Sequence, residues 1–214
     1  MRHRKYLNRT FFQLKSIGLW AFVPFATFSV LFPALLLLST KNAINPLESA
    51  RNLSMILLPP MTVWLPVFVW REFIESDGNE LLFLYGRRIK LWDGLRLWVL
   101  ALINLALVQV FSLHFFPELA LLSLWMLLTS LFYFALAYFI SFTAKSTAIT
   151  LMACLLYHFA NLAFPAEHPT PLLFYSAGGY AFEEFWVTYL PMCVLSALFL
   201  ALGVVMNRRM VKYR

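Results

Sequence analysis

Charge is scarce in this 214-residue sequence. Asp, Glu, Lys and Arg together make up 13% of the chain, whereas soluble domains carry about 25%, and 62% of the residues are hydrophobic. The mean hydropathy is +0.75. A single soluble core of this size cannot bury so much apolar surface. These values therefore exclude a soluble protein and predict an integral membrane protein.

Cysteine is also scarce. The two cysteines, Cys154 and Cys193, both fall inside apolar stretches. Neither has the spacing of a disulfide framework or of a zinc site. We interpret both as small reduced hydrophobic residues and expect the chain to bind no metal.

Several catalytic and binding motifs are missing as well. The sequence contains no GxxxxGK[ST] loop that would cradle nucleotide phosphates, and no GxSxG or HExxH motif of a hydrolase. The formal charge of +7 does not indicate a nucleic-acid partner, because the basic residues flank apolar stretches. In that position they act as topology signals and as contacts to lipid headgroups.

What the sequence does contain is a series of six apolar stretches. Each has 18 to 24 residues, and a helix needs about 20 residues to cross the hydrocarbon core of a bilayer. The pattern predicts an all-α polytopic membrane protein with six transmembrane helices, at residues 17–38, 53–70, 97–116, 119–142, 147–164 and 185–206.

The basic residues predict the orientation of these spans. Fifteen lie on one side: five in residues 1–16, five in residues 71–96, one in the turn 143–146 and four after residue 206. The opposite side has two, Lys41 and Arg51. Because cytoplasmic loops carry the excess of Lys and Arg, we expect both termini in the cytoplasm.

Two segments outside the spans have a distinct character. Residues 1–16 carry five bases and no acid, with Leu7, Phe11 and Leu14 on one helical face, which predicts an amphipathic helix along the cytoplasmic leaflet. A frayed charged tail is the alternative. Residues 165–184 combine three prolines, a Gly178-Gly179 pair and an apolar middle. We expect a short helix or re-entrant segment at the outer interface, because irregular backbone is not tolerated against lipid.

Polar residues gather on one face of the fifth span. Cys154, His158 and Asn161 are spaced so that they share this face. They either hydrogen-bond to neighbouring helices or line a water-filled path. A third hypothesis is an intramembrane metalloprotease site that adds Glu183 and Glu184, but the EExxxR pattern of prenyl-processing proteases lacks its arginine here.

The stretch 71–93 contains an apolar run inside an acidic loop. Asp77 can cap a helix with Glu80 three residues later, and Gly86 suits its end. This predicts a two-turn helix over about 78–85 that displays Leu81, Leu82, Leu84 and Tyr85.

Two turns alone are marginal in water, so this short helix should be stabilised by docking. Its apolar side chains suit either the bilayer interface or a groove on a cytosolic protein. Like charges repel, so the surrounding acids disfavour anionic lipid and favour a protein partner; these acids are Glu72, Glu75, Asp77 and Glu80.

The layout resembles that of permease subunits of type-2 ATP-binding-cassette exporters. The local pattern is similar too: acids after the second span, a glycine, then Glu80-Leu81-Leu82 and a basic entry to the third span at Lys90. The sequence departs from the family at Tyr85-Gly86, near which the family often has a proline.

The resemblance implies a half of a pump in a bacterial cytoplasmic membrane. A second permease copy or a related permease would complete the translocation path, and a separate ATPase subunit would bind ATP and Mg²⁺, so that this chain is not an enzyme and holds no cofactor. The short helix would be the coupling helix, with ATPase-coupling residues Glu75, Glu80, Leu81, Leu82, Leu84 and Tyr85.

Spans two and five usually line the path in this family, which would place Cys154, His158 and Asn161 near it. A hydrophobic or amphipathic peptide, lipid or drug is the expected cargo. The alternatives are a substrate-capture subunit of a vitamin importer, which also has about six spans, and the intramembrane metalloprotease.

Overall fold

A computed structural model describes residues 11–75, 89–164 and 185–210, which are helical with short turns and contain no strand. The elements follow one another along the chain as η1 (Gly18–Ala21), α2 (Phe22–Ala26), η2 (Thr27–Leu31), α3 (Phe32–Asn42), α4 (Pro46–Met61), α5 (Trp64–Ile74), α7 (Ile89–Phe115), η3 (Pro117–Leu119), α8 (Ala120–Ala144), α9 (Thr147–Ala163) and α10 (Phe185–Met210).

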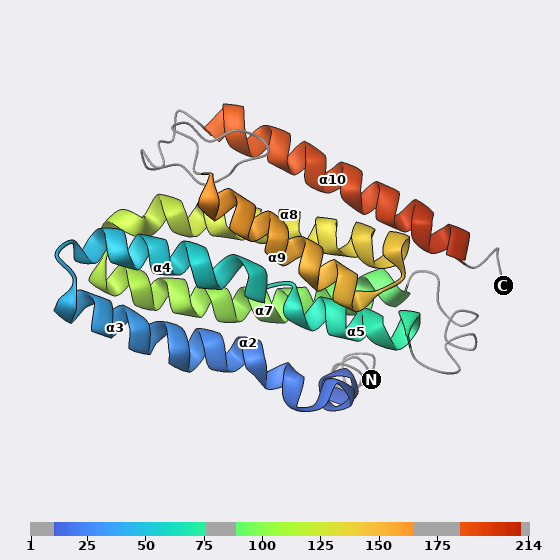
Figure 1. Cartoon of the computed structure of the whole chain (residues 1–214), viewed down its shortest axis with the longest axis horizontal. Coiled ribbons are helices and arrows are strands. Elements are labelled where there is room, and N and C mark those ends of the chain that lie inside the picture. The colour runs from blue at the N-terminus through green and yellow to red at the C-terminus, as the bar shows by residue number, and fades with distance from the viewer. Residues whose placement is uncertain (1–10, 76–88, 165–184, 211–214) are drawn as a thin grey trace, which may run out of the picture.

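The long helices lie side by side and alternate in direction (Figure 1). The end of α5, the start of α7, the α8–α9 turn and the end of α10 all lie at one end of the bundle, which we call the Glu75 end. The α3–α4 and α7–α8 turns lie at the opposite end, which we call the Arg51 end. The membrane side that each end faces stays a prediction.

Five of the helical stretches in the described residues are long and apolar enough to cross a membrane: Phe11–Ser39, Pro46–Ile74, Lys90–Phe115, Pro117–Ala144 and Tyr189–Arg208. The sixth predicted span corresponds to α9, which has 17 residues. At 1.5 Å per residue α9 is about 25 Å long, a little less than the hydrocarbon thickness. The all-α class and five long apolar helices are thus confirmed in the described residues, while the crossing of a membrane by six helices stays a prediction.

The first span is bent near its start. Residues 11–17 are helical, and Gly18 then adopts a φ of 69°. Side-chain-bearing residues rarely adopt that conformation, so glycine allows the chain to turn there. Of the predicted amphipathic helix 1–16, residues 1–10 lie outside the described part of the chain.

The second span is interrupted by prolines. Pro59 and Pro60 lie in the last turn of α4, which ends at Met61, and α5 begins three residues after Met61 at Trp64. A proline has no N–H, so these two leave the carbonyls of Met55 and Ile56 without their usual helical donors. The second apolar stretch is therefore interrupted at this proline pair, and the Ile56 carbonyl needs a donor from another part of the chain.

The predicted loop 71–93 is too long at both ends. Helix α5 continues to Ile74, and α7 already begins at Ile89 rather than at residue 97. Lys90 and Asp93, which the sequence analysis placed in the loop, belong to α7 and are buried, with exposed fractions of 0% and 1%. Their charge suggested solvent, but both find partners inside the bundle.

Aromatic residues fill the core next to this loop. The ring of Trp70 packs against those of Phe134 and Tyr138, with centroids 5.5 and 5.2 Å apart. Gly94 of α7 makes room for the same indole, because a Cβ at that position would lie 2.5 Å from a ring carbon of Trp70. This close approach fixes the start of α7 against α5.

Candidate functional site

Glu75 terminates α5 and reaches across to the first residue of α9. Its Oε1 accepts hydrogen bonds from the backbone N–H of Thr147 at 2.6 Å and from the Thr147 hydroxyl at 2.8 Å. The first N–H groups of a helix have no partner within it and carry partial positive charge, so a carboxylate is well placed there. Glu75 therefore ties the end of α5 to the start of α9.

The other carboxylate oxygen of Glu75 lies on its own helix. Arg71 Nε is 3.4 Å from Oε2, in an i,i+4 pair whose Glu75 side chain is 33% exposed. The pair holds the carboxylate in one orientation while leaving it in reach of water. We call the contact between Glu75 and Thr147 the Glu75 anchor.

Lys90 forms a second attachment, on the other side of residues 76–88. Its ammonium has no exposed surface and donates a hydrogen bond to Oδ1 of Asn207 in α10 at 3.3 Å. The same Nζ lies 5.8 and 5.7 Å from the ring centroids of Phe73 and Phe142, a cation–π arrangement. We call the contact between Lys90 and Asn207 the Lys90 anchor.

The Lys90 anchor extends into two further helices. Asn207 donates from Nδ2 to the hydroxyl of Tyr138 in α8 at 3.1 Å, and Trp70 Nε1 in α5 donates to the Lys90 carbonyl at 3.0 Å. These bonds satisfy polar groups that would be costly to bury alone. The start of α7 is therefore attached to α5, α8 and α10 together.

Both flanks of segment 76–88 are thus attached to helices other than their own. Glu75 holds α9, and Lys90 holds α10. The segment is continuous with α5 and α7, and the two anchors join the flanks of these helices to α9 and α10.

His158 supplies a partner for the Ile56 carbonyl, whose usual helical donor is missing at Pro60. Its Nε2 lies 3.0 Å from the carbonyl oxygen of Ile56, which can only accept, so this nitrogen carries the proton. The Nδ1 atom then accepts from the hydroxyl of Tyr133 at 3.1 Å. The interpretation of His158 as an interhelical hydrogen-bonding residue is confirmed, since it joins α9 to α4 and α8.

Cys154 and Asn161 lie on the same buried face of α9 as His158, with exposed fractions of 1% and 0%. Asn161 donates from Nδ2 to the carbonyl of Tyr157 at 2.8 Å. The three residues are brought together as the sequence predicted, and they face the interior of the chain. Their role in lining a translocation path stays a prediction.

A metal centre gains no support from the described residues. They contain no group of three or more His, Cys, Asp and Glu side chains placed to hold a metal ion. His158 has both ring nitrogens engaged in hydrogen bonds, which leaves no lone pair for a metal. Glu183 and Glu184 lie outside the described residues.

Of the predicted ATPase-coupling residues, only Glu75 is described. Glu80, Leu81, Leu82, Leu84 and Tyr85 lie outside the described residues, as does the expected re-entrant segment 165–184. The partners of the anchors, Thr147 and Asn207, were not singled out from the sequence. In the sequence, Thr147 is recognisable only as the first residue of an apolar helix. Asn207 is recognisable only as a single amide near the end of another helix.

Comparison of the chain with protein-family models, curated proteins and solved structures found no match.

Proposed function

We propose that this chain is the membrane-spanning permease subunit of an ATP-binding-cassette exporter. It forms a translocation path with a second copy or a related permease in a bacterial cytoplasmic membrane, with both termini inside. A separate subunit binds and hydrolyses ATP with Mg²⁺. The cargo is a hydrophobic or amphipathic peptide, lipid or drug.

The observation that carries this proposal is the pair of anchors on either side of residues 76–88. A loop that receives a push from an ATPase needs a route by which the push reaches the spans. The Glu75 and Lys90 anchors supply such routes to α9 and α10.

The two anchors differ in how readily they can break. Glu75 is one-third exposed, so water can replace its bonds to Thr147 at small cost. Lys90 is fully buried between Asn207 and two aromatic rings, and separating it from Asn207 would remove a hydrogen bond from a buried cation that water does not reach. In the proposed cycle α7 and α10 therefore move as one unit, while α5 and α9 can slide apart.

The test is co-purification with a candidate ATP-binding-cassette ATPase from the same organism. Leu81→Asp and Leu84→Asp should abolish capture of the ATPase while leaving the permease in the membrane, because a charge in a docking groove is desolvated without a partner. Ile44→Asp is the matched control. Ile44 is fully exposed at the Arg51 end and should not affect capture.

Unchanged capture of the ATPase by both leucine variants would overturn the proposal. Purification of the chain alone with a stoichiometric small molecule would instead favour the substrate-capture subunit of an importer.

A further inference from the structure

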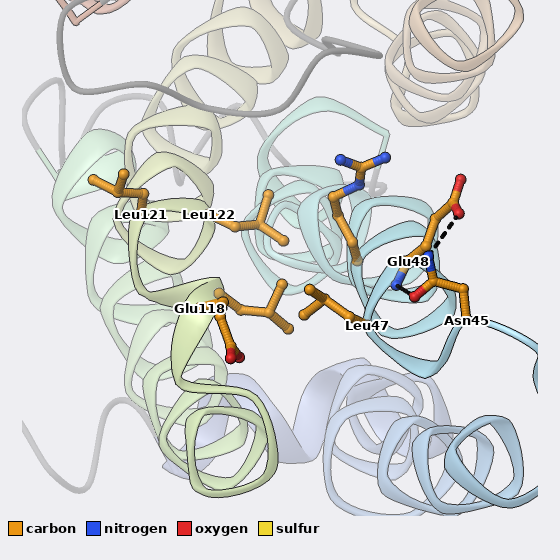
Figure 2. Close-up of a pocket in the computed structure, with 8 residues that line it drawn as sticks. Asn45, Leu47, Glu48, Glu118, Leu121 and Leu122 are labelled. Carbon is orange, nitrogen blue, oxygen red and sulfur yellow. Dashed lines mark hydrogen bonds between the residues drawn. The ribbon is translucent and has the colours of Figure 1, made fainter.

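The Arg51 end holds a cavity that the proposed function does not use. It measures about 400 Å³ and lies between the first turns of α4 and α8. Its walls include Leu47, Glu48 and Arg51 on one side and Glu118, Leu121 and Leu122 on the other. Figure 2 shows Leu47 and Leu122 facing the gap between the two helices, with Glu48 and Glu118 at its edges.

Arg51 is the unusual member of this set. Its Nε atom is buried and has no hydrogen-bond partner among the described residues. A buried guanidinium N–H without an acceptor costs free energy, so native proteins supply one from protein, water or ligand. An acceptor carried by a ligand in the cavity, such as a phosphate oxygen, would meet this need.

The two carboxylates at the cavity favour a ligand that is also cationic. Glu48 is oriented by Asn45, whose Nδ2 lies 3.3 Å from Oε2, and Glu118 comes from the opposite helix. Both are exposed. A purely anionic ligand would meet two negative charges here, whereas one that carries an ammonium beside its anion would be attracted to both signs.

The location points to lipid. The candidate membrane spans Pro46–Ile74 and Pro117–Ala144 both begin at this cavity, so it lies where a bilayer places its headgroups. Leu47 and Leu121 are 37% and 39% exposed, and such apolar side chains beside charged ones suit the boundary between headgroup and acyl chain.

We propose that this cavity binds the headgroup of a zwitterionic aminophospholipid. Its phosphate accepts from Arg51, its ammonium donates to Glu118 or Glu48, and the start of an acyl chain contacts Leu47 and Leu121. The proposal requires that α4 and α8 cross the bilayer and does not depend on exporter activity.

The experiment is native mass spectrometry of the full chain in detergent, with one phospholipid added at a time. Phosphatidylethanolamine should be retained about tenfold more than phosphatidylcholine, whose methylated nitrogen has no N–H to donate, and than phosphatidylglycerol, which lacks the cation. Equal retention of the three lipids by the wild-type chain would overturn the proposal.

Variants test separately the residues that would bind the phosphate and those that would bind the ammonium of the headgroup. Arg51→Gln should lower retention of all three lipids, and Glu118→Gln combined with Glu48→Gln should remove the preference for phosphatidylethanolamine over phosphatidylcholine. Lys41→Gln is the control, since it removes an exposed cation from the same end without lining the cavity. Arg51→Lys keeps the charge without the Nε donor and serves if Arg51→Gln fails to fold.

A competition arm separates a lipid from a free anion. Glycerophosphoethanolamine should displace the lipid, whereas millimolar inorganic phosphate should not. The assignment would be contradicted if Arg51→Gln retained the lipid as well as the wild-type chain does. It would also be contradicted if inorganic phosphate displaced the lipid.

Discussion

Removal of the Glu75 carboxylate should loosen α9 from the rest of the bundle. In Glu75→Ala the backbone N–H of Thr147 loses its acceptor and must bond to water or stay unpaired. The Thr147 hydroxyl also loses an acceptor, which lies at 2.8 Å in the wild type. Thr147→Val removes only the hydroxyl and leaves the backbone N–H in place. The two changes therefore probe one contact from both sides.

The magnitude follows from the number and the exposure of the bonds. Two hydrogen bonds to a charged acceptor contribute about 1.5–3 kcal/mol each when buried. The Glu75 side chain is 33% exposed, so water recovers part of this on mutation. We expect Glu75→Ala to lower the free energy of unfolding by about 1–2 kcal/mol, and Thr147→Val by about 1 kcal/mol.

The assay is unfolding in mixed micelles by titration with sodium dodecyl sulfate, followed by circular dichroism. The double variant gives the coupling free energy between Glu75 and the Thr147 hydroxyl, for which we expect about 0.5–1 kcal/mol. Thr143→Val is the matched control, because the Thr143 hydroxyl bonds to Phe139 of its own helix. Its effect should simply add to that of Glu75→Ala.

A coupling below about 0.3 kcal/mol would refute the reasoning, because independent sites already add within that error. In the proposed complex with an ATPase, Glu75→Ala should also reduce cargo movement per ATP hydrolysed while capture of the ATPase persists. Loss of capture together with transport would mean that Glu75 contacts the ATPase rather than relaying its motion.

Two further predictions concern packing inside the spans. Gly94→Ala should destabilise the chain by about 1–3 kcal/mol, because the new Cβ would lie 2.5 Å from the Trp70 ring, and the loss should appear in the same detergent titration with a shift in tryptophan emission. His158→Leu should cost about 1–3 kcal/mol by leaving the Ile56 carbonyl unpaired. Adding Pro60→Ala should recover part of that loss, since residue 60 would regain the N–H that a helix directs at this carbonyl, and no recovery would contradict the role given to His158.

The spans were predictable because length and hydrophobicity alone decide whether a helix can cross a bilayer. The start of α7 was not, because Lys90 and Asp93 read as solvent-facing charges. The burial of Lys90 depends on Asn207 and on aromatic rings from other spans, and these partners are distant in sequence. Asp93 pairs with Arg96 of the same helix. A single sequence shows which residues carry charge, but not which distant groups accept it.

In the candidate site, too, local features were predictable from the sequence and contacts between distant residues were not. Glu75 was selected for its place after the second span, yet its partner Thr147 lies 72 residues away. Cys154, His158 and Asn161 were correctly grouped because helical periodicity depends only on local spacing. The contact between His158 and the proline-interrupted helix could have been sought from the sequence. Two prolines inside a span predict backbone carbonyls that need a hydrogen-bond donor from another helix.

That link has a consequence for the biogenesis of the protein. Ribosomes release a chain from its N-terminus, and the donor for the Ile56 carbonyl is made 102 residues after it. The kinked second span therefore leaves the ribosome before the group that completes its backbone hydrogen bonding exists. The hydrogen bond between His158 and Ile56 can therefore form only after α9 has been made.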